Sequence, residues 1–582
     1  SEDRVYIFEH QLTLEAAYGS VLHRKRRILH RRVAEALERL YPLQVEARLG
    51  VLAEHWQRAG DAKRALDHLQ RAGEQAAAQY ANVEALDFLT RALALSPEGD
   101  EETRYELLAA RERIHHRRGD REAQTRDLNA LGILANRSSD ARRRAEVALR
   151  RAEQAAITYH SGAAFDAAQK ALELAREVGD AQLEALAYRR LAQAKTEPSA
   201  ASVQALPYLE RALTVARFAG LQRLEAEIQY EMGAIQAYDH HLEGQDLIRH
   251  AIDFFHEVGD RVGEGWAYNA LALTHGGFGH YEEARAAGRQ ALAILREIGD
   301  RRGEGFRLMA IGYSTMSLGL FSEALGYLTA AQKLCRQVEE SAYETRALVC
   351  MGVLFDLLGD YEQAWSKFEE ALELPVERAG LVSWSWALEQ KALLLIHCGD
   401  PRGGLAYAQR ALDFLDEAGD AAAHGWLPSG RAMSHAVKGH ALLQLGDGQR
   451  AIEAYRRALG IERKAGAPGM PYEFRAGLAR AYLSQGEMDA ALAQVEQILS
   501  YLETGHVYGT MEPTRTYLTC YRVLAAAGDA RADGVLHEGH ELLMAWAANV
   551  DDEDLRRSYL ENVTVNRELA AVYRSAVDGS HL

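Results

Sequence analysis

The strongest constraint on this chain is an internal repeat with a period of 40 residues. The Gly-Asp-Arg tripeptide that begins at Gly259 returns at Gly299, and the Gly-Glu-Gly tripeptide at Gly263 returns at Gly303. Between the copies lie two apolar-periodic segments, which are separated by a glycine-rich turn at 276–279. A fixed period of about 20 to 50 residues is typical of proteins that stack one supersecondary unit on the next.

Small residues return with the same period at two further places. One series stands near the end of each unit: Ala251, Ala291, Ala331, Ala371 and Ala411. The other stands at the middle of each unit: Gly279, Gly319, Gly359 and Gly399, after which the spacing loosens to Gly446, Gly486 and Gly528. Where two helices cross closely, only a small side chain fits between them. The pattern therefore predicts helix–turn–helix units, with alanine at the crossing and glycine in the turn.

One unit carries the residues of a known repeat. They are Leu348, Met351, Gly352 and Phe355 on the first predicted helix, Gly359, Asp360 and Tyr361 in the turn, and Ala364, Phe368 and Ala371 on the second. This pattern resembles the tetratricopeptide repeat, although the period is 40 residues instead of about 34. The resemblance implies an all-α fold, a right-handed superhelical solenoid of tetratricopeptide-type helical hairpins.

The N-terminal stretch resembles a second family. The residues that carry this likeness are Tyr6, Phe8, His10, Glu15, Ala16, Ala17, Tyr18, Arg26, Arg27 and His30. They are similar to the passage that leads from the ATPase and winged-helix region into the repeats in bacterial signalling ATPases of the STAND type. The segments 52–93 and 555–569 resemble the first and last repeats of such proteins. The resemblance implies the sensor arm of a multidomain regulator or an adenylate-cyclase-linked relative.

Four segments are expected along the chain. Residues 1–45 would be a helical segment that follows a missing ATPase and winged-helix region, and residues 46–175 would be irregular N-terminal repeats. Residues 176–500 would be a regular tetratricopeptide-like array, and residues 501–582 a C-terminal repeat with capping helices. Because the chain starts at Ser1 in mid-pattern, we expect a fragment of a longer protein. ATP and Mg²⁺ are expected only in that missing upstream domain.

Composition narrows the classes of partner. The formal net charge is −17, which argues against a nucleic-acid-binding surface over the whole molecule. The four cysteines are scattered without a CxxC pair, so we expect neither disulfides nor a structural zinc site. No apolar run approaches the roughly 18 residues that a membrane span needs. A cytoplasmic protein without membrane or direct nucleic-acid contacts is expected.

A basic run from His23 to Arg32 stands out in this acidic chain. It could contact phosphate or an acidic partner domain. It could equally be a solvated helix face, and the sequence leaves both interpretations open.

Catalytic motifs are missing from the sequence. There is no GxxxxGK[ST] loop, and no serine or cysteine stands in a nucleophile elbow. The histidines at His537 and His540 are three residues apart and lack the HExxH spacing of a zinc protease. The sequence therefore predicts a protein that is not an enzyme and that carries no cofactor in this fragment.

Binding residues are better sought on the first helix of each unit. The family resemblance implies that positions 2, 5, 9 and 12 of that helix line a concave groove. The candidates are Trp266, Asn269, Phe306, Tyr313, Arg346, Asp356, Trp386, Glu389, His440 and Arg480. Aromatic faces with a few charged and amide groups suit a sugar, a nucleotide base or a peptide. Alternatively, the aromatic side chains pack between neighbouring units.

Two functional hypotheses follow. The first is a non-catalytic sensor arm of a STAND-type regulator, which binds an effector or a protein partner in its groove and is coupled to its own upstream ATPase domain. The second is a protein–protein adaptor that recognises a peptide or a helix along the groove. A basic clamp for a carboxylate, to which Arg346, Lys391, Lys438 and Arg480 are candidates, would favour the adaptor.

Overall fold

We analysed a computed structural model of the chain. It describes these residues: 18–138, 140–158, 160–195, 203–238, 242–338, 340–418, 427–465, 470–503 and 512–579. Within these ranges the chain is helical and has no strand. None of the described helices is both long and apolar enough to cross a membrane. The part of the STAND-like passage that precedes Tyr18 lies outside the described residues.

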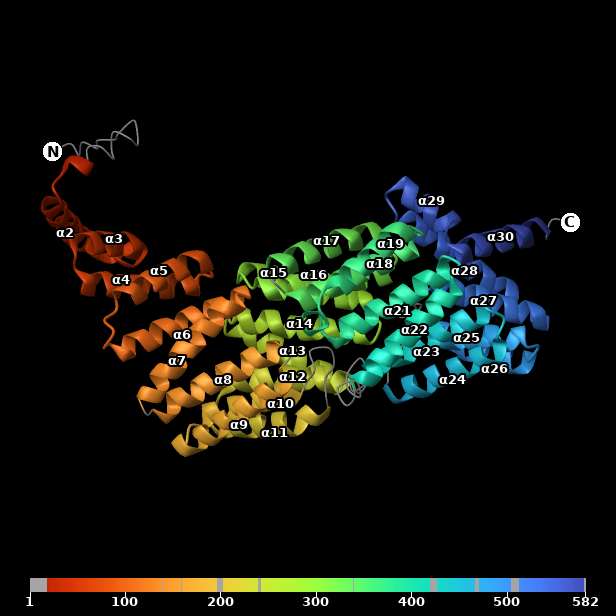
Figure 1. The fold of residues 1–582 in the computed structure, drawn as a ribbon, viewed down its shortest axis with the longest axis horizontal. Coiled ribbons are helices and arrows are strands. Elements are labelled where there is room, and N and C mark those ends of the chain that lie inside the picture. The colour runs from red at the N-terminus through yellow and green to blue at the C-terminus, as the bar shows by residue number, and fades with distance from the viewer. Residues whose placement is uncertain are drawn as a thin grey trace. The chain divides into compact units, whose positions relative to one another are not determined.

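The chain forms two units, of which the first runs to Val147. Its helices, seen in red and orange in Figure 1, are α2 (His23–Leu40), α3 (Leu49–Ala59), α4 (Ala62–Ala78), α5 (Asn82–Leu95), α6 (Glu101–Arg118) and α7 (Arg121–Arg137), with 3-10 turns η1 (Pro42–Gln44) and η2 (Glu46–Arg48). The boundary between the units falls within α8 (Ala141–Ile157). From α2 to α7, each helix packs on the next one in sequence.

The second unit is a longer array of helical hairpins. Its helices are α9 (Ser161–Val178), α10 (Ala181–Lys195), α11 (Leu206–Phe218), α12 (Gln222–Tyr238), α13 (Leu242–Glu257), α14 (Arg261–Gly277), α15 (Tyr281–Glu297), α16 (Arg301–Ser317), α17 (Phe321–Gln337), α18 (Ser341–Leu357), α19 (Tyr361–Glu373), α20 (Val376–Ala379), α21 (Leu381–His397), α22 (Pro401–Glu417), α23 (Leu427–Gln444), α24 (Gly448–Ala465), α25 (Met470–Ser484), α26 (Met488–Leu502), α27 (Pro513–Ala527), α28 (Ala532–Ala548), α29 (Glu553–Glu561) and α30 (Thr564–Gly579), and the 3-10 turn η3 (Val203–Ala205) precedes α11. Consecutive helices pack in pairs, which confirms the predicted all-α solenoid of helical hairpins.

The alanine and glycine series occupy the places that the period predicts. The five alanines of the first series are fully buried in the second helices of their hairpins. Gly319 and Gly359 have φ of 73° and 75°, the left-handed conformation in which only glycine is unstrained. The helix–turn–helix reading of the repeat is therefore confirmed at both positions.

The repeated Gly-Asp-Arg-x-Gly-Glu-Gly motif marks the entry to the first helices α14 and α16. Asp300 caps α16 by accepting a hydrogen bond from the Gly303 backbone N–H at 2.9 Å. A Cβ at Gly303 would lie 2.8 Å from that carboxylate, and one at Gly305 would lie 2.8 Å from the sulfur of Cys335 on α17. The motif thus combines an N-cap with glycines that let the neighbouring helix approach closely.

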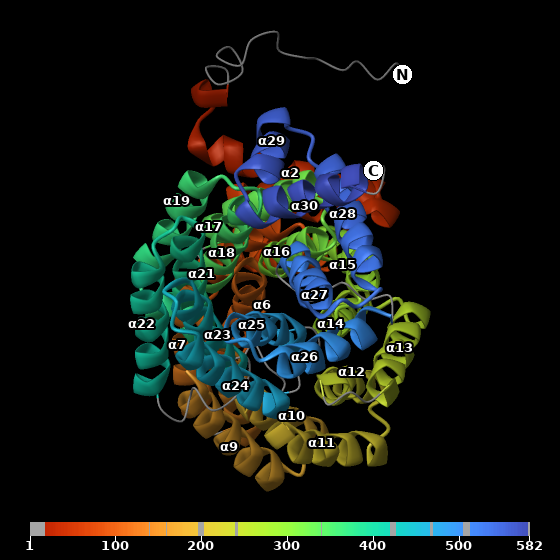
Figure 2. The same ribbon diagram turned by 90° about the vertical axis from the view of Figure 1, so that its right-hand side faces the viewer.

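The C-terminal helices fold back on the middle of the array. The Trp546 ring of α28 lies 5.5 Å from the Phe321 ring at the start of α17, and Tyr559 of α29 lies 5.7 Å from the same ring. The Tyr361 hydroxyl donates to the carbonyl of Asn562 at 3.3 Å. Figures 1 and 2 both show α29, in dark blue, beside the green helices α17 and α19. We call this contact the closure of the array.

Candidate functional site: a buried polar network at the closure

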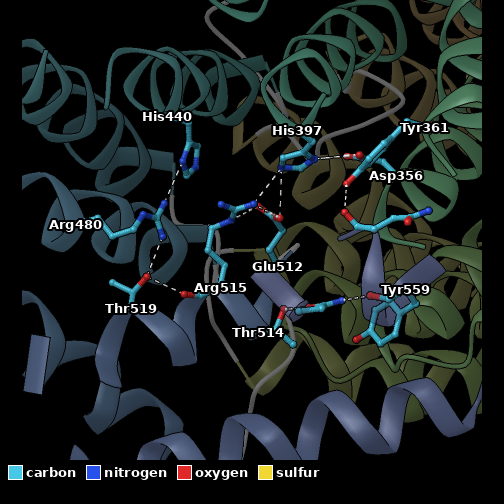
Figure 3. A network of polar contacts seen from close by, with 12 residues as sticks. Asp356, Tyr361, His397, His440, Arg480, Glu512, Thr514, Arg515, Thr519 and Tyr559 are labelled. Atoms are coloured by element: carbon cyan, nitrogen blue, oxygen red, sulfur yellow. Dashed lines mark hydrogen bonds and ion pairs between the residues drawn. The ribbon is translucent and has the colours of Figure 1, made fainter. Parts of the chain in front are cut away.

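A chain of polar side chains runs through the closure, and it is assembled from the ends of successive first helices. Asp356 and His397 stand at the C-terminal ends of α18 and α21, while Glu512 and Arg515 stand at the N-terminal end of α27 (Figure 3). More than 100 residues separate His397 from Glu512, so this part of the site exists only in the closed array.

His397 is held between two carboxylates. Its Nδ1 lies 2.9 Å from Asp356 Oδ2, and its Nε2 lies 3.4 Å from Glu512 Oε1. Burial alone would lower the pKa of His397, but the two carboxylates outweigh it and raise the pKa to about 10. The ring is therefore an imidazolium at neutral pH, whose Nδ1 donates to Asp356 and whose Nε2 lies within ion-pair distance of Glu512.

Arg515 completes the balance of charge around Glu512. Its guanidinium donates twice to this carboxylate, from Nη2 at 2.7 Å and from Nε at 2.8 Å. Burial opposes ionisation of Glu512, yet Arg515 and His397 hold the pKa of this carboxyl well below its ordinary value. Two part-buried cations thus face two buried carboxylates, and charge-assisted hydrogen bonds of this kind are the strong ones.

A second branch of the network leads away from Arg515. The Thr519 hydroxyl donates to the Arg515 carbonyl at 2.7 Å and accepts from Arg480 Nη1 at 2.9 Å. Arg480 Nη2 donates to His440 Nδ1 at 3.1 Å. An imidazole nitrogen that accepts must be unprotonated, and burial together with Arg480 lowers the pKa of His440 well below its ordinary value. His440 is therefore neutral, in contrast to His397.

A cavity of about 220 Å³ adjoins the network. Asp356, His397 and Glu512 line its polar side, and its apolar wall includes Phe321, Trp546 and Tyr559. Thr514 and Asn566 line it as well, and the Thr514 hydroxyl donates to Asn566 Oδ1 at 2.8 Å. The lining thus offers aromatic faces beside hydroxyl, amide and charged groups, a combination that binds small polar ligands.

The charge state of His397 limits the chemistry that this residue can perform. His397 is fixed as a cation by two carboxylates, so it does not exchange protons near neutral pH in the way a general base does. Among the described residues, no group of three or more His, Cys, Asp or Glu side chains could hold a metal ion.

Three of the ten predicted groove residues, Asp356, His440 and Arg480, belong to this network. His397, Glu512, Arg515 and Thr519 also belong to it, but sequence reasoning missed them. Some of them could have been found from the sequence, because they occupy the same position in successive repeats, which we call a column. The column is Asp356, His397, His440, Arg480 and Thr519, at steps of 41, 43, 40 and 39 residues. Glu512 and Arg515 follow a stretch that breaks the period and gave no such signal.

The predicted aromatic residues lie elsewhere on the first helices. The rings of Tyr313 and Trp386, both half-buried, meet edge to face at 6.1 Å. Phe306 is buried against Tyr343, with ring centroids 4.7 Å apart. Trp266 is half-buried on α14. These rings make contacts within and between units while Tyr313, Trp386 and Trp266 keep part of their surface exposed.

The remaining predicted polar residues are engaged by neighbours. Asn269 is buried and accepts from the Arg307 guanidinium, whose Nε lies 2.9 Å from Oδ1. Arg346 donates from Nε to the Ser383 hydroxyl at 3.1 Å. Glu389 is buried beside Ser434, and burial raises the pKa of its carboxyl well above the ordinary value. None of these three joins the network at the closure.

Comparisons with known proteins agree with the repeat architecture. Residues 224–297 and 442–504 each match a family model of the tetratricopeptide repeat. The chain contains a tetratricopeptide-type repeat region. Residues 137–194 and 313–392 match the family model of anaphase-promoting complex subunit 5.

Similar proteins cover the chain unevenly. An uncharacterized protein of Rhizobium meliloti (strain 1021) is 35% identical over 103 residues, which is 18% of this chain and 10% of that protein. This chain thus matches a small part of that relative's length. Among solved structures, the alignment with yeast Tom70 covers 88% of this chain and 97% of the Tom70 chain, with a TM-score of 0.32 and 14% sequence identity. The alignment with a chain of the APC/C hetero-tetramer Cut9–Hcn1 covers 86% of this chain and 96% of that chain, with a TM-score of 0.30 and 15% sequence identity.

Proposed function

We propose that this chain is a non-catalytic sensor arm, whose repeats bind an effector at the closure and thereby favour the closed array. The main observation behind the proposal is that the cavity is lined both by the repeats and by the C-terminal helices. Asp356 and His397 come from the repeats, whereas Glu512 and Asn566 come from the C-terminal helices. A ligand in such a cavity contacts both sides at once, and it loses those contacts when the array opens.

Differential affinity is what a sensor needs. A ligand shifts a two-state equilibrium only by the ratio of its affinities for the two states. Opening would also separate the His397 imidazolium from Glu512 and expose Trp546. The closed and open states therefore differ in buried charge and in buried aromatic surface, and a small ligand can tip the balance between them.

We propose further that the chain is part of a cytoplasmic regulator of the STAND type. It is supported by the resemblance of the N-terminal passage, of which Tyr18, Arg26, Arg27 and His30 lie on or beside α2 in the first unit. In this setting the upstream domain would hold ATP, and the closure would report the effector to it.

The alternative function is a protein–protein adaptor that binds a peptide or helix of a partner in its groove, and one observation tests the carboxylate clamp that such an adaptor would use. Lys391, a candidate for a carboxylate clamp, is buried with its ammonium 4.1 Å from the Trp365 ring and 4.8 Å from the Tyr407 ring, and it forms an ion pair with Glu369. Because these partners lie on second helices, Lys391 is not available to a peptide carboxylate. The small effector is therefore favoured.

Native mass spectrometry of the purified chain tests the proposal. Val563 lines the cavity and is half-buried, so Val563→Phe fills part of the space. We expect a bound small molecule on the wild-type chain that is lost in Val563→Phe and kept in Val258→Phe, where the valine is exposed at the end of α13. A ligand that survives in Val563→Phe would place the binding site elsewhere. A spectrum without added mass would count against the effector.

A further inference from the structure

The first helix that the structure describes carries an apolar stripe that its own unit does not cover. On one side of α2, Ala34 and Leu37 pack against Leu52 and Trp56 of α3. On another side, three apolar residues are exposed: Leu29 by 44%, Val33 by 41% and Leu40 by 63%. Their spacing of 4 and 7 residues places them on one face of the helix. Leu22, which is 78% exposed, is the N-cap residue just before the helix.

The same helix is strongly basic. It contains seven arginine or lysine residues and two glutamates, a formal charge of +5, within a chain whose net charge is −17. Lys25 and Arg32 flank the stripe on one side and Arg26 flanks it on the other. Lys25 and Arg32 form no ion pair with any residue in the described ranges. The positive charge along this edge of the stripe is therefore not neutralised locally.

We propose that this face of α2 is a docking surface for an acidic amphipathic helix of a partner protein. The apolar stripe has the 7-and-4 spacing of the seam between two paired helices, in which side chains of one helix insert between those of the other. The flanking cations meet carboxylates at the edges of such a seam. The inference is independent of the effector cavity, which lies in the other unit.

Charge and shape disfavour two other occupants. A second copy of the chain, docked symmetrically, would bring two helices of charge +5 together, and like charges across an interface are repelled. A membrane surface prefers a broad apolar face with aromatic residues. Here the stripe is narrow and aliphatic, and the adjacent side of α2 is already packed on α3.

Binding of a designed probe to the full chain tests the proposal. The probe is a labelled synthetic helix with leucines at heptad a and d positions and glutamates beside them, measured by fluorescence anisotropy. We expect saturable binding that weakens about tenfold or more in the double variant Leu29→Ser and Val33→Ser. Ile28→Ser is the matched control, because Ile28 is 47% exposed on the same helix but lies about 120° away from the stripe. Its binding should equal that of the wild type.

Charge gives the second readout. Affinity should fall with added salt, because exposed charges are screened over about 10 Å at 0.1 M salt. A probe with lysine in place of glutamate should not bind.

Four results would overturn the proposal. The acidic probe could fail to bind, or Ile28→Ser could weaken it as much as the double variant does. Binding could require removal of residues 1–17, which would make that segment the occupant. Finally, vesicles of phosphatidylserine and phosphatidylcholine could bind the chain more tightly than the probe and compete with it for α2.

Discussion

The charge of His397 allows a quantitative test of the closure. The ordinary imidazole pKa is 6.5, and the neighbouring carboxylates raise that of His397 to about 10. At about 1.4 kcal/mol per pH unit, this difference corresponds to at most about 5 kcal/mol of stability from the protonated ring. Since the folded-state pKa is raised, this stability is fully present below pH 6.5. It is lost progressively as the pH rises through about 10.

Replacing His397 by glutamine removes the positive charge but keeps a side chain that can donate one hydrogen bond. Asp356 and Glu512 would then lose a shared cation in a buried site. Breaking a buried ion pair from one side costs about 3–5 kcal/mol, so we expect a loss of this size at pH 7. The wild-type chain should approach the variant as the pH is raised towards 10.

Urea unfolding followed by circular dichroism at pH values from 6 to 10 measures the effect. His435→Gln is the matched control, because His435 is also buried but burial lowers its pKa to about 4. That ring is neutral throughout the range, so the control should keep the wild-type pH dependence. The reasoning is refuted if His397→Gln and the wild type lose stability in parallel between pH 6.5 and 10. It is also refuted if the control flattens the profile as much.

Three further perturbations address other parts of the array. Ala291→Leu should cost about 1–3 kcal/mol by overpacking the helix crossing, whereas Ala293→Leu on the exposed side of the same helix should leave the urea midpoint unchanged. Burial raises the pKa of the Glu462 carboxyl to about 7, so the wild-type chain loses stability as the pH rises from 4.5 through 7. Glu462→Gln should therefore be more stable than the wild type at pH 8. A wild-type chain that is equally stable at pH 5 and pH 8 would contradict this. Gly319→Ala and Gly446→Ala share the strain of a left-handed turn, but only at Gly319 would the new methyl group collide with an indole of the closure. Hydrogen exchange should therefore speed up in α28 to α30 for Gly319→Ala alone.

The repeat itself was predictable because it is encoded locally. Each hairpin needs a small residue at its crossing and a residue with positive φ in its turn, and both needs appear in the chain at the same period. Ala291 and Gly319 stand where that logic places them. The same logic explains the motif at Gly303, where the N-cap and the close neighbour both require glycine.

The polar network was only partly predictable. Asp356, His440 and Arg480 were candidates because they stand at inward positions of the first helices, and His397 occupies the same column of the repeat. A column of charged residues in an otherwise apolar helix face is a signal that a buried charge must be paired. The identity of the partner at Glu512 does not follow from the column, because that residue comes from a segment outside the regular period.

The closure could not be read from the sequence for a physical reason. In a solenoid each unit contacts its neighbours, and the path of the array accumulates from a small rotation at every step. Whether α28 returns to α17 depends on the sum of those rotations, and no single residue determines that sum. Gly319 and Gly446 are therefore indistinguishable as turn glycines, although one of them receives the Trp546 indole and the other has open space beside it. Residues that look like ordinary repeat positions acquire a role only through where the array closes, and it is at such positions that we expect binding to be coupled to conformation.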